Sequence, residues 1–552
     1  MLELERPVLD TAAALIAADR ELWEDAKAAA RHGPKVLVPT TVTGFHHVVT
    51  VESVLGLALT LRGAQVHYFV CEGTLPACMF SELDRVPDVG IFERYELAPT
   101  ICAGCAGRGA ATYAPLGLTI HRLGKNLTAE QRAFAREVPK GLNRDAMRAL
   151  KVDGLAVGEH AHAGALRYFA RGDLDEGTGS DIVLARYLEA ALLTLYATRN
   201  VLERVSFNAA VFHHGIYVPQ GVIGEVCRRQ GVRVVNWNPS YRRNTFIFSH
   251  GDTYHHTLMH ESPDQWSDLP WSEAHERDIM TYLASRTSGA RDWIWFHERP
   301  DDDFIRYAGE VGIDLSKPLI GLLTNVVWDA QLHYPANAFP NMLGWLVETI
   351  RWFAGHPELQ LVIRVHPAEL RGTAPSRQPV INEIAKAFPE LPCNVFVIPP
   401  ESHVSTYAAM GHCDSVLIYG TKTGVELTSI GVPVLVGGEA WIRGKGLTRD
   451  ANTPEEWFAL LGELPIGRRL DEATTRRARK YAYHFFFRRM IPLPFISASK
   501  RIYSMGLHSL DELRPGAHPG LDTVCEGILN GGPFVYPAEF LGIHDAEPLA
   551  AR

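Results

Sequence analysis

The chain has 552 residues, of which 46% are hydrophobic and 21% charged, and its formal net charge is −9. This length predicts two or three domains, and the acidic balance argues against nucleic-acid binding, because no basic excess is available to neutralise phosphates. No apolar run approaches the length of a membrane span, and the acidic start MLELERPVLD does not resemble a signal peptide, so we expect a cytoplasmic location.

The first part of the chain predicts a leading helix and then a βαβ unit. Residues 9–31 are rich in Ala, Leu and charged residues, and they precede the strand KVLVPTT, the helix VVTVESVLGLALTLRG and the strand AQVHYFVCEG. Two strands joined by a helix predict a right-handed crossover in a parallel sheet. His46 and His47 stand in the loop after the first strand. The unit lacks the GxGxxG pattern of dinucleotide-binding folds.

Four cysteines follow this unit: Cys71, Cys78, Cys102 and Cys105. The last two form a CxxC pair, whose spacing places two thiolates on one turn and suits tetrahedral metal ligation. A chain this long without a secretion signal indicates reduced thiols or metal ligands and not a disulfide framework. Two interpretations stay open: a structural zinc or iron–sulfur cluster held by all four residues, and buried free thiols that pack as small hydrophobes.

Residues 125–205 are mostly helical by period, and residues 209–240 predict a second βαβ unit. Its first strand ends in a polar turn that contains His214, and Tyr217 follows closely. Such a turn lies at the carboxyl end of a parallel strand, where α/β proteins bind ligands.

A new α/β pattern starts at about residue 316. Two of its strands, LIGLLTNVVWDA and LVIRVHPAE, each run into a polar segment. The polar segments contain Thr324, Asn325 and Asp329 after the first strand, and Arg364, His366 and Pro367 after the second. Because parallel strands end at one edge of a sheet, both segments should face the same crevice.

The segment 414–448 predicts a strand, a tight polar turn, a short helix that stops at Gly431, and a second buried strand. The turn consists of Thr421, Lys422, Thr423 and Gly424. Free N–H groups and the helix dipole favour an anion at such a turn, and a glycine lets a ligand approach the backbone. Glu426 is placed to accept hydrogen bonds from ribose hydroxyls, although an ordinary βαβ unit with a surface glutamate is the alternative.

The strand with RxHP, followed by YGTKTGVELTSIGVPVLVGGEAWIRGKGLT, resembles the nucleotide-sugar-binding half of GT-B glycosyltransferases. The likeness is closest to the capsule polysaccharide synthesis group, which includes Kdo-transferase-like enzymes. It covers residues 316–450 and is only general over the first 300 residues. The resemblance implies an α/β fold of two doubly wound, Rossmann-like domains that face a cleft. It also implies sugar transfer from a nucleotide-sugar donor to a glycan or lipid-linked acceptor, without an obligatory divalent metal.

The resemblance also implies roles for individual residues. The expected nucleotide-sugar-binding residues are Thr324, Asn325, Asp329, Arg364, His366, Pro367, Thr421, Lys422, Thr423, Gly424, Glu426, Arg443 and Lys445. The expected catalytic residues are His46 and His47, with His214 in reserve, because the loop after the first strand of GT-B enzymes borders the acceptor and a histidine there could act as general base.

We expect an acceptor-side α/β domain with a helical insertion over residues 1–310, a donor-binding domain over 316–470, and a crossing helix with an irregular tail over 471–552. The basic and aromatic stretch after residue 470 has a second interpretation, because such a segment could rest on the inner face of a membrane.

Three alternative functions remain at this stage: a nucleotide-sugar 2-epimerase, which needs cleft carboxylates to abstract a carbon-bound proton; a glycerophosphotransferase that uses a CDP-polyol; and a non-catalytic subunit of a polysaccharide export complex.

Overall fold

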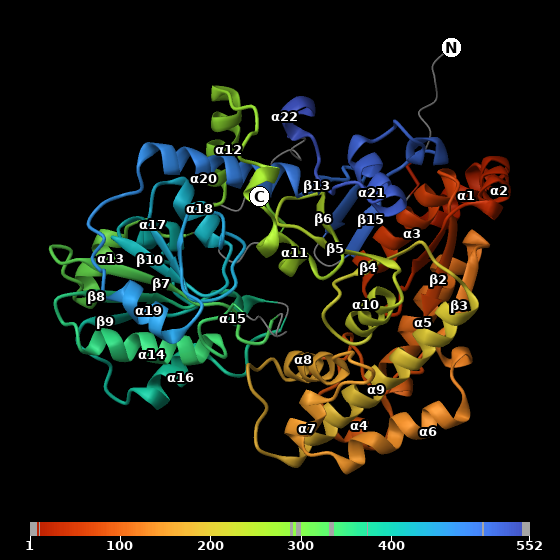
Figure 1. Cartoon of the computed structure of the whole chain (residues 1–552), viewed down its shortest axis with the longest axis horizontal. Helices are drawn as coiled ribbons and strands as arrows, with labels where there is room; N and C mark the ends of the chain where they lie inside the picture. Colours follow the sequence, from red (N-terminus) through yellow and green to blue (C-terminus); the bar gives the residue numbers. More distant parts are fainter. Residues whose placement is uncertain are drawn as a thin grey trace.

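The computed structural model describes residues 8–9, 11–287, 291–293, 300–329, 336–372, 374–499 and 502–543. These residues form two α/β lobes, each built on a largely parallel sheet (Figure 1). The fold-class prediction is confirmed: helices cover both faces of each sheet, and the two lobes face each other in a GT-B type arrangement.

The N-terminal sheet has a core of five parallel strands. In spatial order its strands are β13 (Ile491–Pro492), β6 (Thr245–His250), β5 (Arg233–Pro239), β4 (Ala209–His213), β1 (Lys35–Val38), β2 (Gln65–Val70) and β3 (Thr119–Arg122). Strands β5 to β3 run parallel, whereas β6 and β13 are antiparallel to their neighbours. The chain order reverses between β1 and β4, and such a switch point is where α/β sheets open a crevice.

The side chains of β1 alternate between two cores, as the period of a strand requires. Val36 and Val38 pack with α3 (His46–Leu61), whereas Leu37 packs on the other face. The helices on that other face are α8 (Val157–Phe169), α9 (Thr178–Arg204) and α10 (Gln220–Arg229). The structure differs from the sequence prediction in one detail, because the two histidines expected in the loop after β1 are the first two residues of α3.

The C-terminal sheet is entirely parallel. In spatial order its strands are β12 (Arg449–Asp450), β11 (Val434–Val436), β10 (Ser415–Ile418), β7 (Leu319–Leu323), β8 (Gln360–Arg364) and β9 (Val395–Ile398). Its switch point lies between β7 and β10, so the polar segments after these strands lie side by side.

Helices sandwich this second sheet (Figure 1). One face is covered by α14 (Met342–Ala354), α16 (Val380–Ala387) and α19 (Pro454–Leu461). The opposite face is covered by α17 (Thr406–Gly411), α18 (Thr423–Ser429) and α20 (Glu472–Tyr483).

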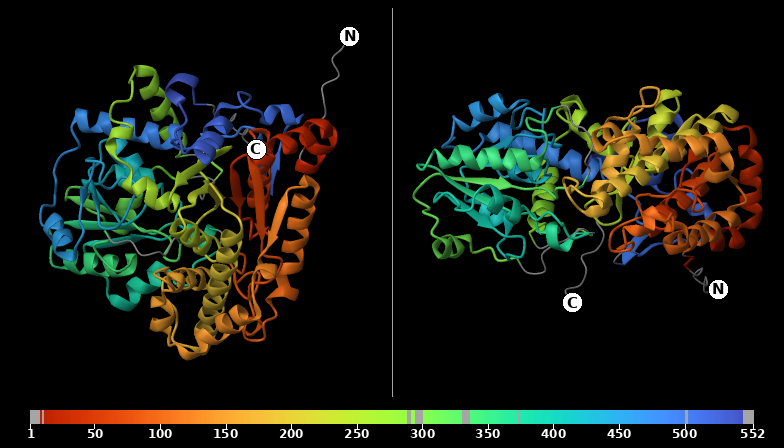
Figure 2. Two further views of the ribbon diagram at one scale, coloured as in Figure 1. Left: turned by 45° about the vertical axis from the view of Figure 1, so that its right-hand side comes forward. Right: turned by 90° about the horizontal axis from the view of Figure 1, so that it is seen from below.

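After α20 the chain returns to the N-terminal lobe (Figures 1 and 2). Strand β13 pairs with β6, the hairpin β14 (Ile496–Ser499) and β15 (Ile502–Met505) follows, and α21 (Pro519–Asn530) packs against α3. The aromatic run Phe485–Phe487 is fully buried in the shared core, so these rings are not available to a membrane surface. Among the described residues, no helix is long and apolar enough to cross a bilayer.

Candidate functional site

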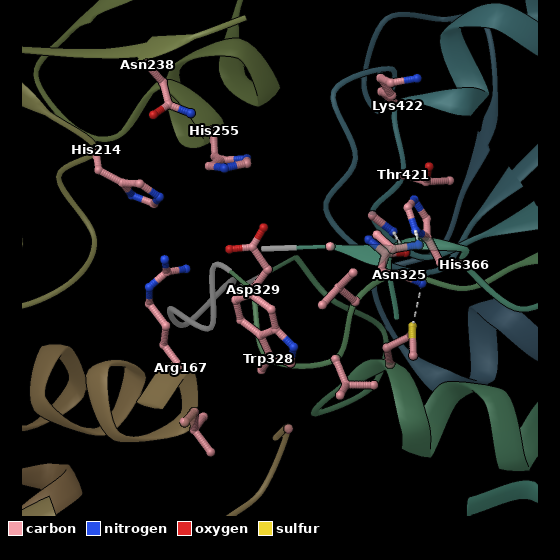
Figure 3. Close-up of a pocket in the computed structure, with 18 of the residues that line it drawn as sticks. Arg167, His214, Asn238, His255, Asn325, Trp328, Asp329, His366, Thr421 and Lys422 are labelled. Atoms are coloured by element: carbon pink, nitrogen blue, oxygen red, sulfur yellow. Dashed lines mark hydrogen bonds between the residues drawn. The ribbon is translucent and has the colours of Figure 1, made fainter. Parts of the chain in front are cut away.

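A cleft of about 2120 Å³ lies between the two lobes and is lined by residues of both. Its walls contain the segments that follow β1 and β4 on one side and those that follow β7, β8 and β10 on the other. The two switch points therefore face each other across the cleft. Figure 3 shows side chains of both walls pointing into this space.

The C-terminal wall is held together by hydrogen bonds between three strand ends. The Thr324 hydroxyl accepts from the backbone N–H of His366 at 3.0 Å, and the Asn325 Oδ1 accepts from the N–H of Gly420 at 3.3 Å. The Nδ1 of His366 accepts from the N–H of Ala368 at 3.0 Å, which assigns the hydrogen of the neutral ring to Nε2. The side chains of Asn325, His366 and Thr421 lie together in Figure 3.

Lys422 lines the cleft, but its ammonium group is part of a buried ion cluster. Its Nζ donates to the Glu426 carboxylate at 2.9 Å, and the Tyr407 hydroxyl donates to it at 2.7 Å. The Nε of Arg286 lies 2.6 Å from the same carboxylate and forms an ion pair with it. Burial favours the neutral form of Glu426, but the charges of Arg286 and Lys422 outweigh it and lower the pKa of this carboxyl. Glu426 does not line the cleft. Its carboxylate binds side chains within the protein and is therefore not placed to accept hydrogen bonds from ribose hydroxyls, in contrast to the sequence prediction.

Three further cationic side chains that the sequence predicted as nucleotide-sugar ligands donate hydrogen bonds to backbone carbonyl oxygens. Arg364 borders the cleft but donates to the carbonyl oxygens of Pro399 and Ser402. Two others do not line the cleft: Arg443 donates to the carbonyl oxygens of residues 438 and 451, and Lys445 to those of residues 259 and 261.

Gly424 also lies away from the cleft. A Cβ at this position would lie 2.7 Å from Cδ1 of Ile418, so the glycine allows α18 to pack closely on β10. The predicted close approach of a ligand is therefore replaced by a close approach of the helix to the strand. Pro367 and Thr423, by contrast, line the cleft, as the sequence predicted for residues of the donor side.

The N-terminal wall contains a layer of histidines around the β1–β4 switch point. His46, His47, His213 and His214 all line the cleft, and the rings of His47 and His213 contact each other with centroids 4.7 Å apart. Beneath them, the buried Glu52 accepts from the backbone N–H of His213 at 3.0 Å. Burial raises the pKa of Glu52 to about 7.

The pKa values of these histidines are lowered, which favours their neutral form. Burial lowers the pKa of His47 to about 4 and that of His214 well below its usual value, with the charge of Arg167 adding to both shifts. His214 also has a left-handed backbone conformation, with φ at 73°. Such strained non-glycine residues cluster at functional sites.

One hydrogen bond joins the two walls directly. The Tyr217 hydroxyl lies 3.1 Å from Oδ1 of Asp329, which follows β7. Arg167 lies beside this pair, with its guanidinium carbon 5.1 Å from the centre of the Tyr217 ring and 5.5 Å from that of Trp328. Figure 3 shows the Asp329 carboxylate facing the side of the cleft on which Arg167, His214 and His255 lie.

Several buried polar atoms of the cleft wall have no hydrogen-bond partner among the described residues. They include the Nε1 of Trp328, the Oε2 of Glu439, and the Nδ1 atoms of His213 and His214. Buried polar groups in native proteins are almost always paired, so these atoms are donors and acceptors that a polar ligand of the cleft could use.

Sequence reasoning missed Arg167, Asn238, His255 and Trp328 as lining residues. Arg167 is inside the helix α8, where no local pattern marks it. Asn238 and His255 stood in polar stretches near predicted strand ends, but only the pairing of distant segments brings them to the cleft.

The four cysteines lie outside the cleft lining, and Cys105 contacts Thr43 in the segment that precedes α3. None of them forms a disulfide. Within the described part of the chain, no group of three or more His, Cys, Asp or Glu residues is arranged to hold a metal ion. The metal site therefore stays a prediction.

Residues 326–477, less than half of the chain, match the family described as Capsule polysaccharide biosynthesis protein. No curated protein matches the sequence. Among solved structures, the chain is similar to the KpsC beta Kdo 2,4 transferase of Thermosulfurimonas dismutans, with 13% identity, a TM-score of 0.32, and coverage of 50% of this chain and 79% of that one. The KpsC beta Kdo 2,7 transferase of the same organism gives 13% identity, a TM-score of 0.30, and coverage of 51% and 79%.

A third similar structure is the UDP-GlcNAc 2-epimerase of Neisseria meningitidis bound to UDP-GlcNAc, with 12% identity, a TM-score of 0.27, and coverage of 90% of this chain and 100% of that one. TM-scores this low do not indicate a shared active-site geometry, so the chemistry has to follow from the cleft itself.

Proposed function

We propose that the protein is a GT-B type glycosyltransferase that moves a sugar from a nucleotide-sugar donor to a glycan or lipid-linked acceptor in surface polysaccharide synthesis. The observation that carries the proposal is the polar cleft between two facing switch points, since each is a preferred ligand site of an α/β sheet. The family match over residues 326–477 covers one wall of this cleft and supports the same assignment.

The donor is assigned to the C-terminal wall. The side chains of Asn325 and Thr421 and the Nε2–H of His366 can donate to phosphate oxygens, and they come from three adjacent strand ends. Donors fixed before the reaction stabilise the charge that develops on the leaving phosphate. This arrangement supports transfer without an obligatory divalent metal.

The acceptor is assigned to the N-terminal wall, and Asp329 is the group that we nominate to activate it. Its carboxylate is held by Tyr217 where the two walls meet. In an inverting transfer, Asp329 takes the proton of the acceptor hydroxyl while the oxygen bonds to the anomeric carbon. The bond from that carbon to the nucleotide phosphate breaks, and its electron pair leaves with the phosphate.

His46, His47 and His214 are the alternative bases. All three line the cleft, and a neutral imidazole can accept a proton. Asp329 is preferred because it contacts both lobes, so it stands where donor and acceptor have to meet. Variants of these residues separate the two assignments.

The function is tested first by binding and then by turnover. A panel of nucleotides and nucleotide sugars is scored by thermal shift, because a ligand stabilises the folded protein by an amount set by its concentration relative to Kd. The best donor is then incubated with and without glycan acceptors. Nucleotide release that depends on the acceptor supports transfer. Conversion of the donor without an acceptor would identify an epimerase, and tight binding without turnover would identify a non-catalytic subunit.

A further inference from the structure

An aromatic pair lies on the N-terminal wall of the cleft, directly before the layer of histidines. Phe45 precedes α3, and Phe80 lies in the loop after β2. The two rings meet edge to face, with their centroids 5.1 Å apart. Both side chains are half-buried and line the cleft. Aromatic rings in such a wall give a ligand apolar contact area.

Two arginines that also line the cleft flank this pair. The guanidinium carbon of Arg85 lies 4.2 Å from the centre of the Phe80 ring and 6.0 Å from that of Phe45. Arg108 donates to the carbonyl oxygen of Gly44. Phe80 packs on the same glycine, where a Cβ would lie 2.5 Å from Cζ of the ring. These contacts join four side chains into one unit, the aromatic–arginine group: Phe45, Phe80, Arg85 and Arg108.

The described part of the chain uses only some of the N–H donors of these arginines. Arg85 donates its Nε to Glu82 at 3.1 Å, and its side chain is 34% exposed. Glu82 is shared, because Arg167 lies 2.9 Å from its other carboxylate oxygen. Arg108 is half-buried and forms no ion pair with a described carboxylate. The aromatic–arginine group therefore has an excess of positive charge and N–H donors that a ligand can use.

The charge balance of the whole N-terminal wall has the same sign. Between residues 44 and 174, six cationic and three acidic side chains line the cleft. The cationic ones are Arg85, Arg108, Arg144, Arg148, Lys151 and Arg167. The complete chain, in contrast, has a net charge of −9. A positive cleft wall in an acidic protein raises the local concentration of anionic ligands.

The aromatic–arginine group belongs to the wall that we assign to the acceptor. Phe45 and Phe80 pack against a small core that contains Tyr217, whose hydroxyl binds Asp329. The group is therefore close to the point where the two walls meet, while the donor is assigned to the opposite wall. At about 2120 Å³ the cleft is larger than the roughly 300–1,000 Å³ of ordinary small-ligand pockets, so it has room for sugars of the acceptor beside the donor.

We propose that the aromatic–arginine group is a binding subsite for an acidic sugar of the acceptor. The apolar face of the sugar ring packs on Phe45 and Phe80, and its carboxylate or phosphate group binds to Arg85 and Arg108. Guanidinium groups suit this role, because they stack on aromatic rings and bind carboxylate or phosphate oxygens in pairs. The inference rests on the proposed glycosyl transfer and adds the chemical class of the acceptor.

The test is calorimetric binding of oligosaccharides to the full-length protein without a donor. One pair of probes is an oligogalacturonide and its carboxyl-reduced counterpart, and the other is a phosphorylated mannan fragment and its dephosphorylated form. We expect one acidic probe to bind roughly tenfold more tightly than its neutral counterpart, because the neutral form lacks the charge-assisted hydrogen bonds. Added salt should reduce this preference. The pair that shows it identifies the acid group as carboxylate or phosphate.

Variants locate the preference on the wall. R85Q/R108Q should bind the acidic and the neutral probe equally, and Phe80→Ala should weaken both probes, because it removes contact area that does not depend on charge. The matched control R229Q/K125Q removes two exposed cations of the same lobe outside the cleft lining and should keep the preference. If the double variant at the subsite does not fold, the single variant Arg108→Gln replaces it and should reduce the preference.

Equal affinity of the wild type for the acidic and neutral forms of both probes would overturn the inference. An undiminished preference in the folded R85Q/R108Q variant would overturn the assignment to this group. The proposed function fails separately. Acceptor-dependent nucleotide release with a neutral glycan, together with equal affinities, would remove the subsite and leave the transferase. A preference for acidic probes in a protein that turns over no donor would leave the subsite and remove the transferase.

Discussion

The Tyr217 hydroxyl and Oδ1 of Asp329 lie 3.1 Å apart, although their residues belong to different lobes. Tyr217 follows the fourth strand of the N-terminal sheet, and Asp329 follows the first strand of the C-terminal sheet. This contact places a carboxylate at the point where ligands of the two walls would meet. It is the basis for assigning the general base.

Asp329→Asn should lower kcat by about 10²–10⁴-fold, because the amide cannot take the acceptor proton. Donor affinity should change little. Tyr217→Phe removes one hydrogen bond to the carboxylate, so a smaller loss is expected, worth about 0.5–1.5 kcal/mol. Steady-state kinetics and calorimetric donor binding measure both effects. The exposed Asp302→Asn is the matched control, and near-full turnover of the Asp329 variant would exclude this residue as the base.

His366→Ala should weaken donor binding by roughly 1–3 kcal/mol, because a hydrogen bond to a charged phosphate is lost. Isothermal calorimetry with the donor selected by thermal shift gives the change in affinity. His403→Ala alters an exposed histidine of the same lobe and should leave affinity unchanged. Equal affinities of the wild type and the His366 variant, with the fold intact, would contradict the donor-site assignment.

The histidine alternative predicts a different set of results. If His46 or His47 is the base, one of the two alanine variants loses turnover with little loss of donor binding, and Asp329→Asn does not. The pKa of His47 is lowered to about 4, so a rate that depends on its neutral form would fall only as the pH drops toward that value. The pH profile of kcat for the wild type and both variants, together with NMR of the product anomer, checks this outcome.

Glu52 should make the protein less stable as the pH rises. Its pKa is raised from 4.5 to about 7 in the folded state by burial. The unfolded chain therefore loses this proton first, and the free energy of unfolding falls between pH 4.5 and 7 by roughly 3 kcal/mol from this group. Glu52→Gln should flatten that part of the profile, measured by urea unfolding at several pH values. Glu21→Gln, at an exposed position, should leave the slope as it is, and an equally steep profile of the Glu52 variant would refute the shift.

Arg286→Ala should destabilise the protein by about 3–5 kcal/mol, because it removes the cation that pairs with the buried carboxylate of Asp292 and leaves Lys422 as the remaining cation of Glu426. Arg306→Ala breaks exposed ion pairs instead and should destabilise the protein much less, because solvent screens such pairs. Chemical unfolding compares the two variants. A similar small loss in both would show that the cluster around Glu426 is not held by the arginine charge.

Much of the fold could be predicted from local sequence patterns. The strands and helices around β1, β4, β7, β8 and β10 follow from short apolar runs and helical periods, since these depend on neighbours close in sequence. The same patterns placed polar segments at the carboxyl ends of parallel strands. This is why His47, His214, Thr324, Asn325 and His366 were expected at a crevice, and they all line the cleft.

The sequence by itself thus determined two α/β units and the strand ends at which ligands bind. Both follow from the alternation of strands and helices along the chain and from the turns between them, which depend on residues close in sequence. Only the tertiary structure decided which charged groups are available there. Arg364, Glu426 and Lys445 match a ligand-binding pattern, but each is occupied by partners that are distant in sequence. The Asp329 carboxylate is held in position by a hydrogen bond from Tyr217 in the other lobe. A buried charge must be paired, and the partner that satisfies it is chosen by the packing of the whole chain.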